Sequence, residues 1–166
     1  MRETAWPPAR RGEGALVDRP RLVARALTGF GQTLISGDLE AAIVALAPGA
    51  QLLGLYAPAQ GAAHALRIAR DRALLVTPTP LGAADGWRDG FCATPVDDGF
   101  AAVEVTGPDA LSALAQGTSA DLAAASPSAA VQFAGLRCLL ARIDGGFRLH
   151  VEAPWLEALL AWLDGA

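Results

Sequence analysis

The chain has 166 residues, a formal net charge of −4, and 52% hydrophobic against 18% charged residues. All thirteen basic residues are arginines and most are scattered, so the chain lacks the basic stripe of a nucleic-acid-binding protein. The low charge content has two interpretations that composition alone leaves open. Either some apolar surface belongs to a partner, or the many alanines expose little apolar area each.

Two cysteines and two histidines further limit the chemistry. Cys92 and Cys138 are far apart with no Cys-x-x-Cys motif, which favours two unpaired, buried thiols in a reducing cytoplasm, with a lone disulfide as the alternative. Two histidines are too few for a zinc site. The N-terminal arginines have no apolar core behind them, so we expect no signal peptide. The uncharged stretch 41–66 is interrupted by proline and glycine, so we expect no membrane-spanning helix.

Three segments organise the chain. Residues 1–26, rich in proline, arginine and glycine, predict a loose N-terminal arm. Residues 27–80 and 91–166 predict two α+β lobes, and 81–90 form a glycine-rich connector.

The first lobe begins with an apolar strand near 32–36. Asp38 is placed to cap a helix whose apolar residues Leu39, Ile43 and Leu46 share one face. A strand at 52–57 and a hairpin turning at Arg70-Asp71 follow.

The second lobe repeats this pattern. Asp97-Asp98-Gly99 predicts a hairpin turn between strands at 91–94 and 100–105. Gly107-Pro108 ends the second strand and starts a helix, as Gly37-Asp38 do in the first lobe. Such a repeat of strand, glycine, acid, helix and hairpin indicates two related units that bury a shared core.

The last hairpin carries an expectation about register. With a three-residue loop at 144–146, Ile143 faces Phe147, Ala141 faces Leu149, and Leu139 faces Val151. This register puts all six apolar side chains on one face and sets Arg142 against Arg148 on the other. The second face is either solvated or an acidic partner's contact surface.

The closing helix, from Pro154 to about Leu163, is apolar nearly all round. Tryptophan is favoured at the centres of interfaces, so we expect this helix to contact a partner protein. The alternative is that the helix packs deeply into the chain's own core. The candidate interface residues are Trp155, Leu159, Trp162, Leu163, Arg142 and Arg148.

No catalytic motif accompanies these elements. The alanine-rich context of His64 predicts that its side chain is structurally satisfied. His150 lies on the same outward strand face as Arg148, which predicts that it is solvated or at an interface. No nucleophile elbow or phosphate-binding loop is present. We expect no catalytic, metal-binding or cofactor-binding residue in this chain.

The second lobe resembles the γ subunit of heterotetrameric sarcosine oxidase and, more loosely, the folate-binding region of the glycine-cleavage T-protein. The resemblance rests on the order and spacing of segments at 96–99, 105–110, 114–122, 139–143 and 147–151, the closing Trp162-Leu163, and 74–78 in the first lobe. It covers roughly 28–164. Thr118 stands where that family has cysteine, Arg72-Ala73 replace its Glu-Trp, and Pro95 interrupts a strand, which suggests a divergent member.

The resemblance implies an α+β fold of two small antiparallel sheets covered by helices. It also implies a non-catalytic, structural subunit of a tetrahydrofolate-linked complex for sarcosine catabolism and one-carbon metabolism. FAD, FMN, NAD and tetrahydrofolate would bind other chains, and the principal partner would be the large flavoprotein α subunit.

Two alternatives stay open. One is a stand-alone folate-binding or aminomethyltransferase-like protein, which needs a carboxylate for the pterin ring. Asp97, Asp98 and Asp121 are its candidates, although each also reads as a turn or cap residue. The other is a homodimer formed through the closing helix.

Overall fold

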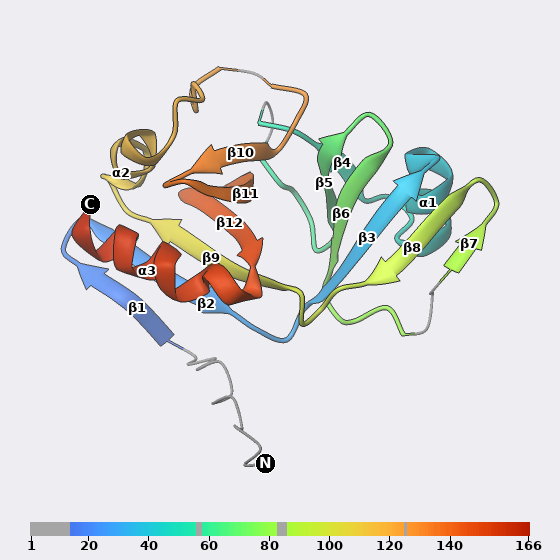
Figure 1. Ribbon diagram of the computed structural model, residues 1–166, viewed down its shortest axis with the longest axis horizontal. Coiled ribbons are helices and arrows are strands. Elements are labelled where there is room, and N and C mark those ends of the chain that lie inside the picture. The colour runs from blue at the N-terminus through green and yellow to red at the C-terminus, as the bar shows by residue number, and fades with distance from the viewer. Residues whose placement is uncertain (1–13, 56–57, 83–85, 125) are drawn as a thin grey trace, which may run out of the picture.

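We describe the chain from a computed structural model in which residues 14–55, 58–82, 86–124 and 126–166 are described (Figure 1). These residues form two six-stranded sheets and three α-helices, which confirms the predicted α+β fold. None of the helices in these ranges is long and apolar enough to cross a membrane.

The β3 sheet has the strand order β4-β5-β6-β3-β8-β7. Its neighbours are antiparallel except for β4 and β5, which are parallel. The strands are β3 (Gly31–Gly37), β4 (Gln51–Leu53), β5 (His64–Ala69), β6 (Arg72–Thr77), β7 (Gly86–Arg88) and β8 (Phe91–Pro95). Helix α1 (Leu39–Leu46) follows β3, and the Asp38 side chain accepts hydrogen bonds from the amides of Glu40 and Ala41, as predicted.

The β9 sheet has the order β1-β2-β9-β12-β11-β10 and is antiparallel throughout. Its strands are β1 (Gly14–Arg19), β2 (Leu22–Leu27), β9 (Phe100–Thr106), β10 (Ala130–Phe133), β11 (Leu136–Ile143) and β12 (Gly146–Glu152). Helix α2 (Ala110–Gly117) follows β9. A 3₁₀ turn, η1 (Ala153–Trp155), leads into α3 (Leu156–Gly165).

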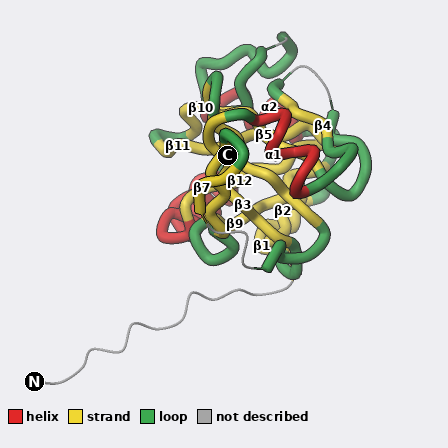
Figure 2. The backbone as a smooth tube through the Cα atoms, turned by 90° about the vertical axis from the view of Figure 1, so that its right-hand side faces the viewer, coloured by secondary structure: helices red, strands yellow, loops and turns green. Residues whose placement is uncertain are grey.

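The two sheets pack face to face, and each is covered by helix on its outer face. Leu39 and Ile43 of α1 join a cluster with the outer face of the β3 sheet, and Leu159 and Leu163 of α3 join one with the outer face of the β9 sheet. A third cluster lies between the sheets, formed by Leu53, Leu66, Leu74 and Val76 against Ala129, Leu139 and Ala141. Figure 2 shows the same elements from the right-hand side of Figure 1. The central strands are therefore buried on both faces.

The predicted repeat is present in the structure. Read from β7, the β3 sheet has the order β7-β8-β3-β6-β5-β4, which matches the order β1-β2-β9-β12-β11-β10. The last strands differ in direction, since β4 is parallel to β5 whereas β10 is antiparallel to β11. Helices α1 and α2 occupy equivalent places after β3 and β9. The two sheets, however, exchange a hairpin. The β1–β2 hairpin precedes β3 in sequence but joins the β9 sheet, and the β7–β8 hairpin precedes β9 in sequence but joins the β3 sheet.

This exchange overturns the predicted hairpin at Asp97-Asp98-Gly99. Strand β8 pairs with β3 rather than with β9, so residues 96–99 carry the chain from one sheet to the other. The local turn does form, since the Gly99 amide donates to the Val96 carbonyl at 2.8 Å, but pairing with distant strands fixes the partners.

The exchange also changes the predicted segments. Residues 14–19 and 22–27 are strands β1 and β2, where a loose arm over 1–26 was expected, while 1–13 lie outside the described residues. Strand β7 lies within the expected connector 81–90. The lobe boundaries themselves stay a prediction, although strands from both expected lobes contribute to the β3 sheet.

The predicted register of the last hairpin is wrong by one residue. Leu139 lies opposite His150, Ala141 opposite Arg148, and Arg142 opposite Phe147, around a two-residue turn. The expectation assumed one buried face, whereas both faces of β11 and β12 are covered. Cys138, Leu140, Leu149 and Val151 face the helices, while Leu139 and Ala141 face the other sheet.

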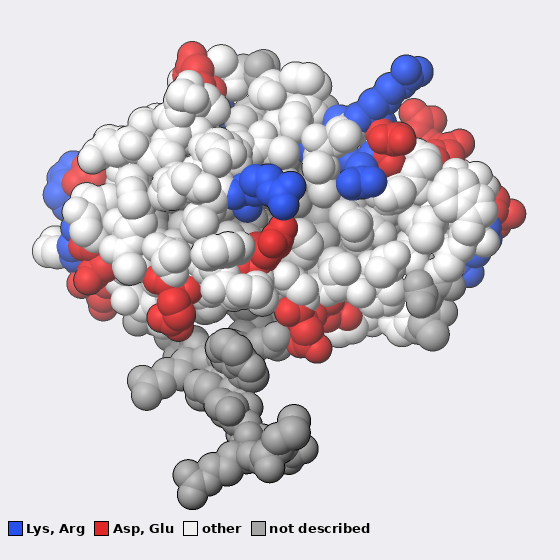
Figure 3. All heavy atoms as spheres, in the orientation of Figure 1, with Lys and Arg blue, Asp and Glu red and all other residues white. Residues whose placement is uncertain are grey.

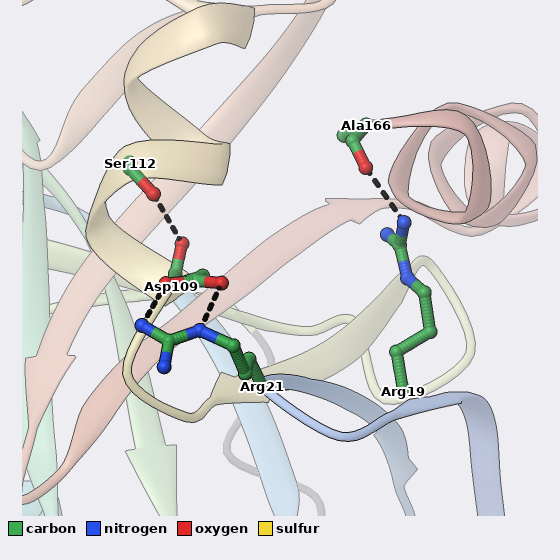
Figure 4. A network of polar contacts seen from close by, with 5 residues as sticks. All are labelled: Arg19, Arg21, Asp109, Ser112 and Ala166. Atoms are coloured by element: carbon green, nitrogen blue, oxygen red, sulfur yellow. Dashed lines mark hydrogen bonds and ion pairs between the residues drawn. The ribbon is translucent and has the colours of Figure 1, made fainter.

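The β1–β2 hairpin is tied to both helices of the β9 sheet (Figure 4). The Arg19 guanidinium donates to the carbonyls of Leu163 and Ala166 at the end of α3, at 2.6 and 2.7 Å. The Arg21 guanidinium holds both oxygens of Asp109 at 2.8 Å, which raises the pKa of Arg21 and lowers that of Asp109. Asp38 caps its helix with its side chain, whereas the equivalent Asp109 binds the hairpin and makes no such cap.

Each unit contains the same kind of close backbone contact, at the end of its central strand β3 or β9. Gly37 and Gly107 have φ values of +100° and +111°, and a Cβ on either would lie 2.4 Å from a carbonyl oxygen, that of Gly90 or of Arg21. The next acidic residue donates its amide to the same oxygen, Asp38 to Gly90 at 2.9 Å and Asp109 to Arg21 at 3.1 Å. Each exchanged hairpin is therefore held by its own contact of this kind, and each contact requires a glycine.

Gly107→Ala should lower the free energy of unfolding by about 3 kcal/mol or more, because it adds a steric clash to an unfavourable φ. The matched control is Gly49→Ala, where φ is +86° but a Cβ would have nothing within 4 Å. We expect that control to cost only about 1 kcal/mol. Urea denaturation measures both, and equal losses would show that the hairpin contact is unimportant.

Candidate functional site

A cluster of buried polar side chains lies between the two sheets. Gln32 on β3 is 2% exposed and His150 on β12 is fully buried, and the Gln32 Oε1 and His150 Nδ1 atoms lie 2.8 Å apart. The Gln32 Nε2 donates to the Phe100 carbonyl at 2.9 Å, so Oε1 is the acceptor facing the histidine. His150 therefore carries its proton on Nδ1, and its Nε2 has no hydrogen-bond partner among the described residues.

His64 on β5 extends this cluster. It is 3% exposed, and neither of its ring nitrogens has a partner among the described residues. Burial and then the charge of Arg148 lower the pKa of His64 to about 4. Burial, followed by repulsion from His64 and Arg148, lowers the pKa of His150 to about 3. Both histidines are neutral near pH 7.

The charge that faces these histidines belongs to an ion pair. Arg148 on β12 donates to Glu104 on β9, its cross-strand neighbour, at 3.1 Å. Their side chains are 23% and 28% exposed. Because β12 turns this face towards the other sheet, His150 and Arg148 lie at the sheet-to-sheet contact instead of the outward, solvated face that was expected.

The cluster offers no pair of nucleophile and base. No described serine, threonine or cysteine is hydrogen-bonded to either histidine. Burial raises the pKa of Cys138 to about 12, which leaves its thiol protonated. The described residues contain no group of three or more metal-ligating side chains. The arrangement is suited to joining two sheets in one register.

A cavity of about 300 Å³ lies beside this cluster, where the chain crosses between the sheets. Phe30 and Phe100 provide aromatic walls, and Asp97 and Asp98 provide carboxylates. One oxygen of Asp97 accepts the Gln32 amide at 2.6 Å. Asp121 lies elsewhere and accepts the Ala123 amide at 2.9 Å, so the cavity gathers two of the three predicted pterin-binding candidates.

The predicted interface residues do not share one exposed face. Leu159 and Leu163 are fully buried in the core beneath α3, and Trp162 packs edge-on against Phe133 with ring centroids 4.8 Å apart. Trp155, in the 3₁₀ turn before α3, is 50% exposed. The Arg142 guanidinium donates to the Leu122 carbonyl. The interface itself stays a prediction, and Trp155 is its most accessible member.

Sequence reasoning missed Gln32 and Phe30. Phe30 packs edge-on against the His150 ring, with centroids 6.2 Å apart. The sequence did contain one indication that these residues are buried. Residues 138–141 are all apolar, without the apolar–polar alternation of a half-exposed strand, which is typical of a strand covered on both faces. A polar residue on such a strand, or on its neighbour, needs a partner across the sheets.

The comparisons with known proteins extend to the fold alone. No protein-family profile matches the chain, and no curated protein matches it in sequence. Among solved structures, the chain is similar to one from "Heterotetrameric Sarcosine Oxidase from Corynebacterium sp. U-96 in complex with pyrrole 2-carboxylate". The TM-score is 0.72 at 18% identity, and the match covers 90% of this chain and 85% of that chain.

The lowered histidine pKa values predict a loss of stability in acid. The unfolded chain, with histidine pKa values near 6.5, binds more protons than the folded chain as pH falls from about 6.5 towards 4, so the free energy of unfolding falls by up to about 1.4 kcal/mol per pH unit for each histidine. We expect His64→Leu to reduce this slope between pH 7 and 5 without lowering stability at pH 7, because the His64 ring makes no hydrogen bond with the described residues. Urea unfolding at both pH values tests this, and an unchanged slope would show that His64 titrates normally.

Proposed function

We propose that this chain is a non-catalytic structural subunit, of the γ type, in a sarcosine oxidase-type complex that oxidises an amine and is linked to tetrahydrofolate. The observation that carries the proposal is the fold likeness to a chain of a heterotetrameric enzyme over most of both chains. The two coverages also mean that the matched chain is similar in length to this one. A likeness of that extent supports a role for the whole chain as a small subunit.

The chemistry of the buried cluster agrees with this role. His64 and His150 are neutral, enclosed between the sheets and not hydrogen-bonded to any serine, threonine or cysteine that the structure describes. In the proposal, FAD, FMN, NAD and tetrahydrofolate bind partner subunits in the cytoplasm, and the large flavoprotein α subunit is the principal partner. The proposed contact surface surrounds Trp155, because tryptophan contributes strongly where an interface excludes water.

Co-expression with the large flavoprotein α subunit of a sarcosine oxidase-type complex tests the proposal. The two chains should co-purify, and Trp155→Ser should weaken the complex about tenfold or more while leaving the fold intact. Trp87→Ser is the matched control, because Trp87 is 69% exposed but lies on β7 of the other sheet.

A variant at Trp162 separates binding from folding. Trp162→Ser should destabilise the isolated chain by about 2 kcal/mol, because it removes the contact with Phe133. If the wild-type chain stays monomeric beside the flavoprotein, or if Trp155→Ser and Trp87→Ser act alike, the proposed surface is wrong.

The cavity at the crossing favours a second candidate function, a stand-alone folate-binding protein. A carboxylate can accept two hydrogen bonds from the amino-pyrimidine edge of a pterin ring, and aromatic walls can pack against its faces. Asp97, Asp98, Phe30 and Phe100 provide both features in one cavity.

Calorimetric titration of the purified chain with tetrahydrofolate discriminates between the two candidates. The subunit proposal predicts no heat of binding. A heat signal that Asp98→Asn abolishes, and that the conservative Asp98→Glu partly retains, would favour the stand-alone function instead.

A further inference from the structure

A second hollow of about 430 Å³ lies where the inner faces of the two sheets diverge. Its floor is apolar and comes from both sheets, with Leu34 and Ile68 on the β3 sheet and Phe100 and Leu139 on the β9 sheet. Leu34, Ile68 and Phe100 are only partly buried. The core between the sheets therefore continues to the surface here as an open groove.

Two arginines border this groove, one from each sheet. Arg72 on β6 is exposed, and its side chain makes no hydrogen bond or ion pair with any described residue. Arg137 on β11 has an 86% exposed side chain, and its one charged contact within the described part of the chain is Glu152 at a long 3.5 Å. Figure 3 shows one group of arginine spheres at the centre of this face and a second to its right, with acidic spheres below the first group and beside the second.

The groove thus combines an apolar floor with two weakly neutralised cations on opposite banks. An acidic chain with few charges has no general reason to keep positive charge around exposed apolar surface. A small molecule is a poor occupant, since pockets for such ligands usually bury about 70–90% of the ligand. An extended polypeptide can lie along an open groove, place aliphatic side chains on the floor and reach both arginines with carboxylates.

We propose that this groove binds an extended segment of a partner protein that carries acidic residues among aliphatic ones. Glu152 partly occupies Arg137 in the free chain and is displaced on binding. This inference does not depend on the proposed function, since the groove includes none of α3 and a segment of this chemistry can belong to any partner protein.

Selection of random displayed peptides on the intact chain tests the proposal. The enriched peptides should combine Asp or Glu with Leu, Ile or Val, and their binding should weaken as salt is raised. Arg72→Ala and Arg137→Ala should each weaken an enriched peptide by about tenfold. Arg70→Ala is the matched control, because Arg70 lies exposed at the tip of the same β5–β6 hairpin but does not line the groove.

Two further variants locate the peptide. Ala130→Trp should block binding without changing charge, because Ala130 is exposed and lines the groove. Glu152→Gln should strengthen binding, because it removes the competing carboxylate. The proposal is overturned if no acidic peptide is enriched, or if enriched peptides bind all variants equally. Thermal unfolding should show all variants folded, since every substituted side chain is at least partly exposed.

Discussion

One buried glutamine joins the two halves of this molecule. The Gln32 backbone N–H donates to the Asp97 carboxylate, and the Gln32 backbone carbonyl accepts from the Val96 backbone N–H. The Gln32 side chain donates to the Phe100 carbonyl and accepts from His150. Every main polar group of the residue is thus satisfied by the crossing segment or by the opposite sheet. Because an unsatisfied buried amide costs about 1–3 kcal/mol per group, few other placements of the sheets would be tolerated. The cavity at the crossing and the neutral histidines both follow from this placement.

The polar cluster also makes the two repeated units unequal. If Gly37 is aligned with Gly107, then Gln32 corresponds to Ala102, and the pairing registers make Val76 equivalent to His150 and His64 equivalent to Leu139. Each polar residue of the cluster thus has an apolar counterpart in the other unit. Two copies of either unit alone would lack one side of the Gln32–His150 hydrogen bond. The cluster therefore favours pairing of unlike units, which is a recognised use of buried polar groups.

Local patterns in the sequence predicted what local interactions determine. The Asp38 cap, the helix that it begins and the hairpin at Arg70-Asp71 could be read from the sequence because their signals lie within a few residues. The register of the last hairpin could not, because it depends on a second sheet covering the face that was taken as solvated. The turn at 97–99 has hairpin chemistry, yet the flanking strands go to different sheets, since hydrogen bonding with β3, β12 and β2 is more extensive than a local hairpin provides. Gln32 was missed for the same reason: a lone glutamine on a strand has a meaning only when its distant partners are known.

The layered arrangement also changes how the composition is to be interpreted. Composition alone left open whether a partner covers apolar surface or the many alanines expose little of it, and four layers bury both faces of the central strands within the chain. Bulk hydrophobicity is therefore explained by internal packing and gives little support to an interface. What remains is specific: a few large apolar side chains are exposed among the described residues, namely Leu16, Val44, Trp87, Leu111 and Trp155. Of these, Trp155 directly precedes α3, whose Leu156, Leu159 and Leu163 are buried in the core. An exposed tryptophan next to a well-packed helix is the kind of residue that contributes most to an interface, so Trp155, and not the composition, indicates where the proposed partner would bind.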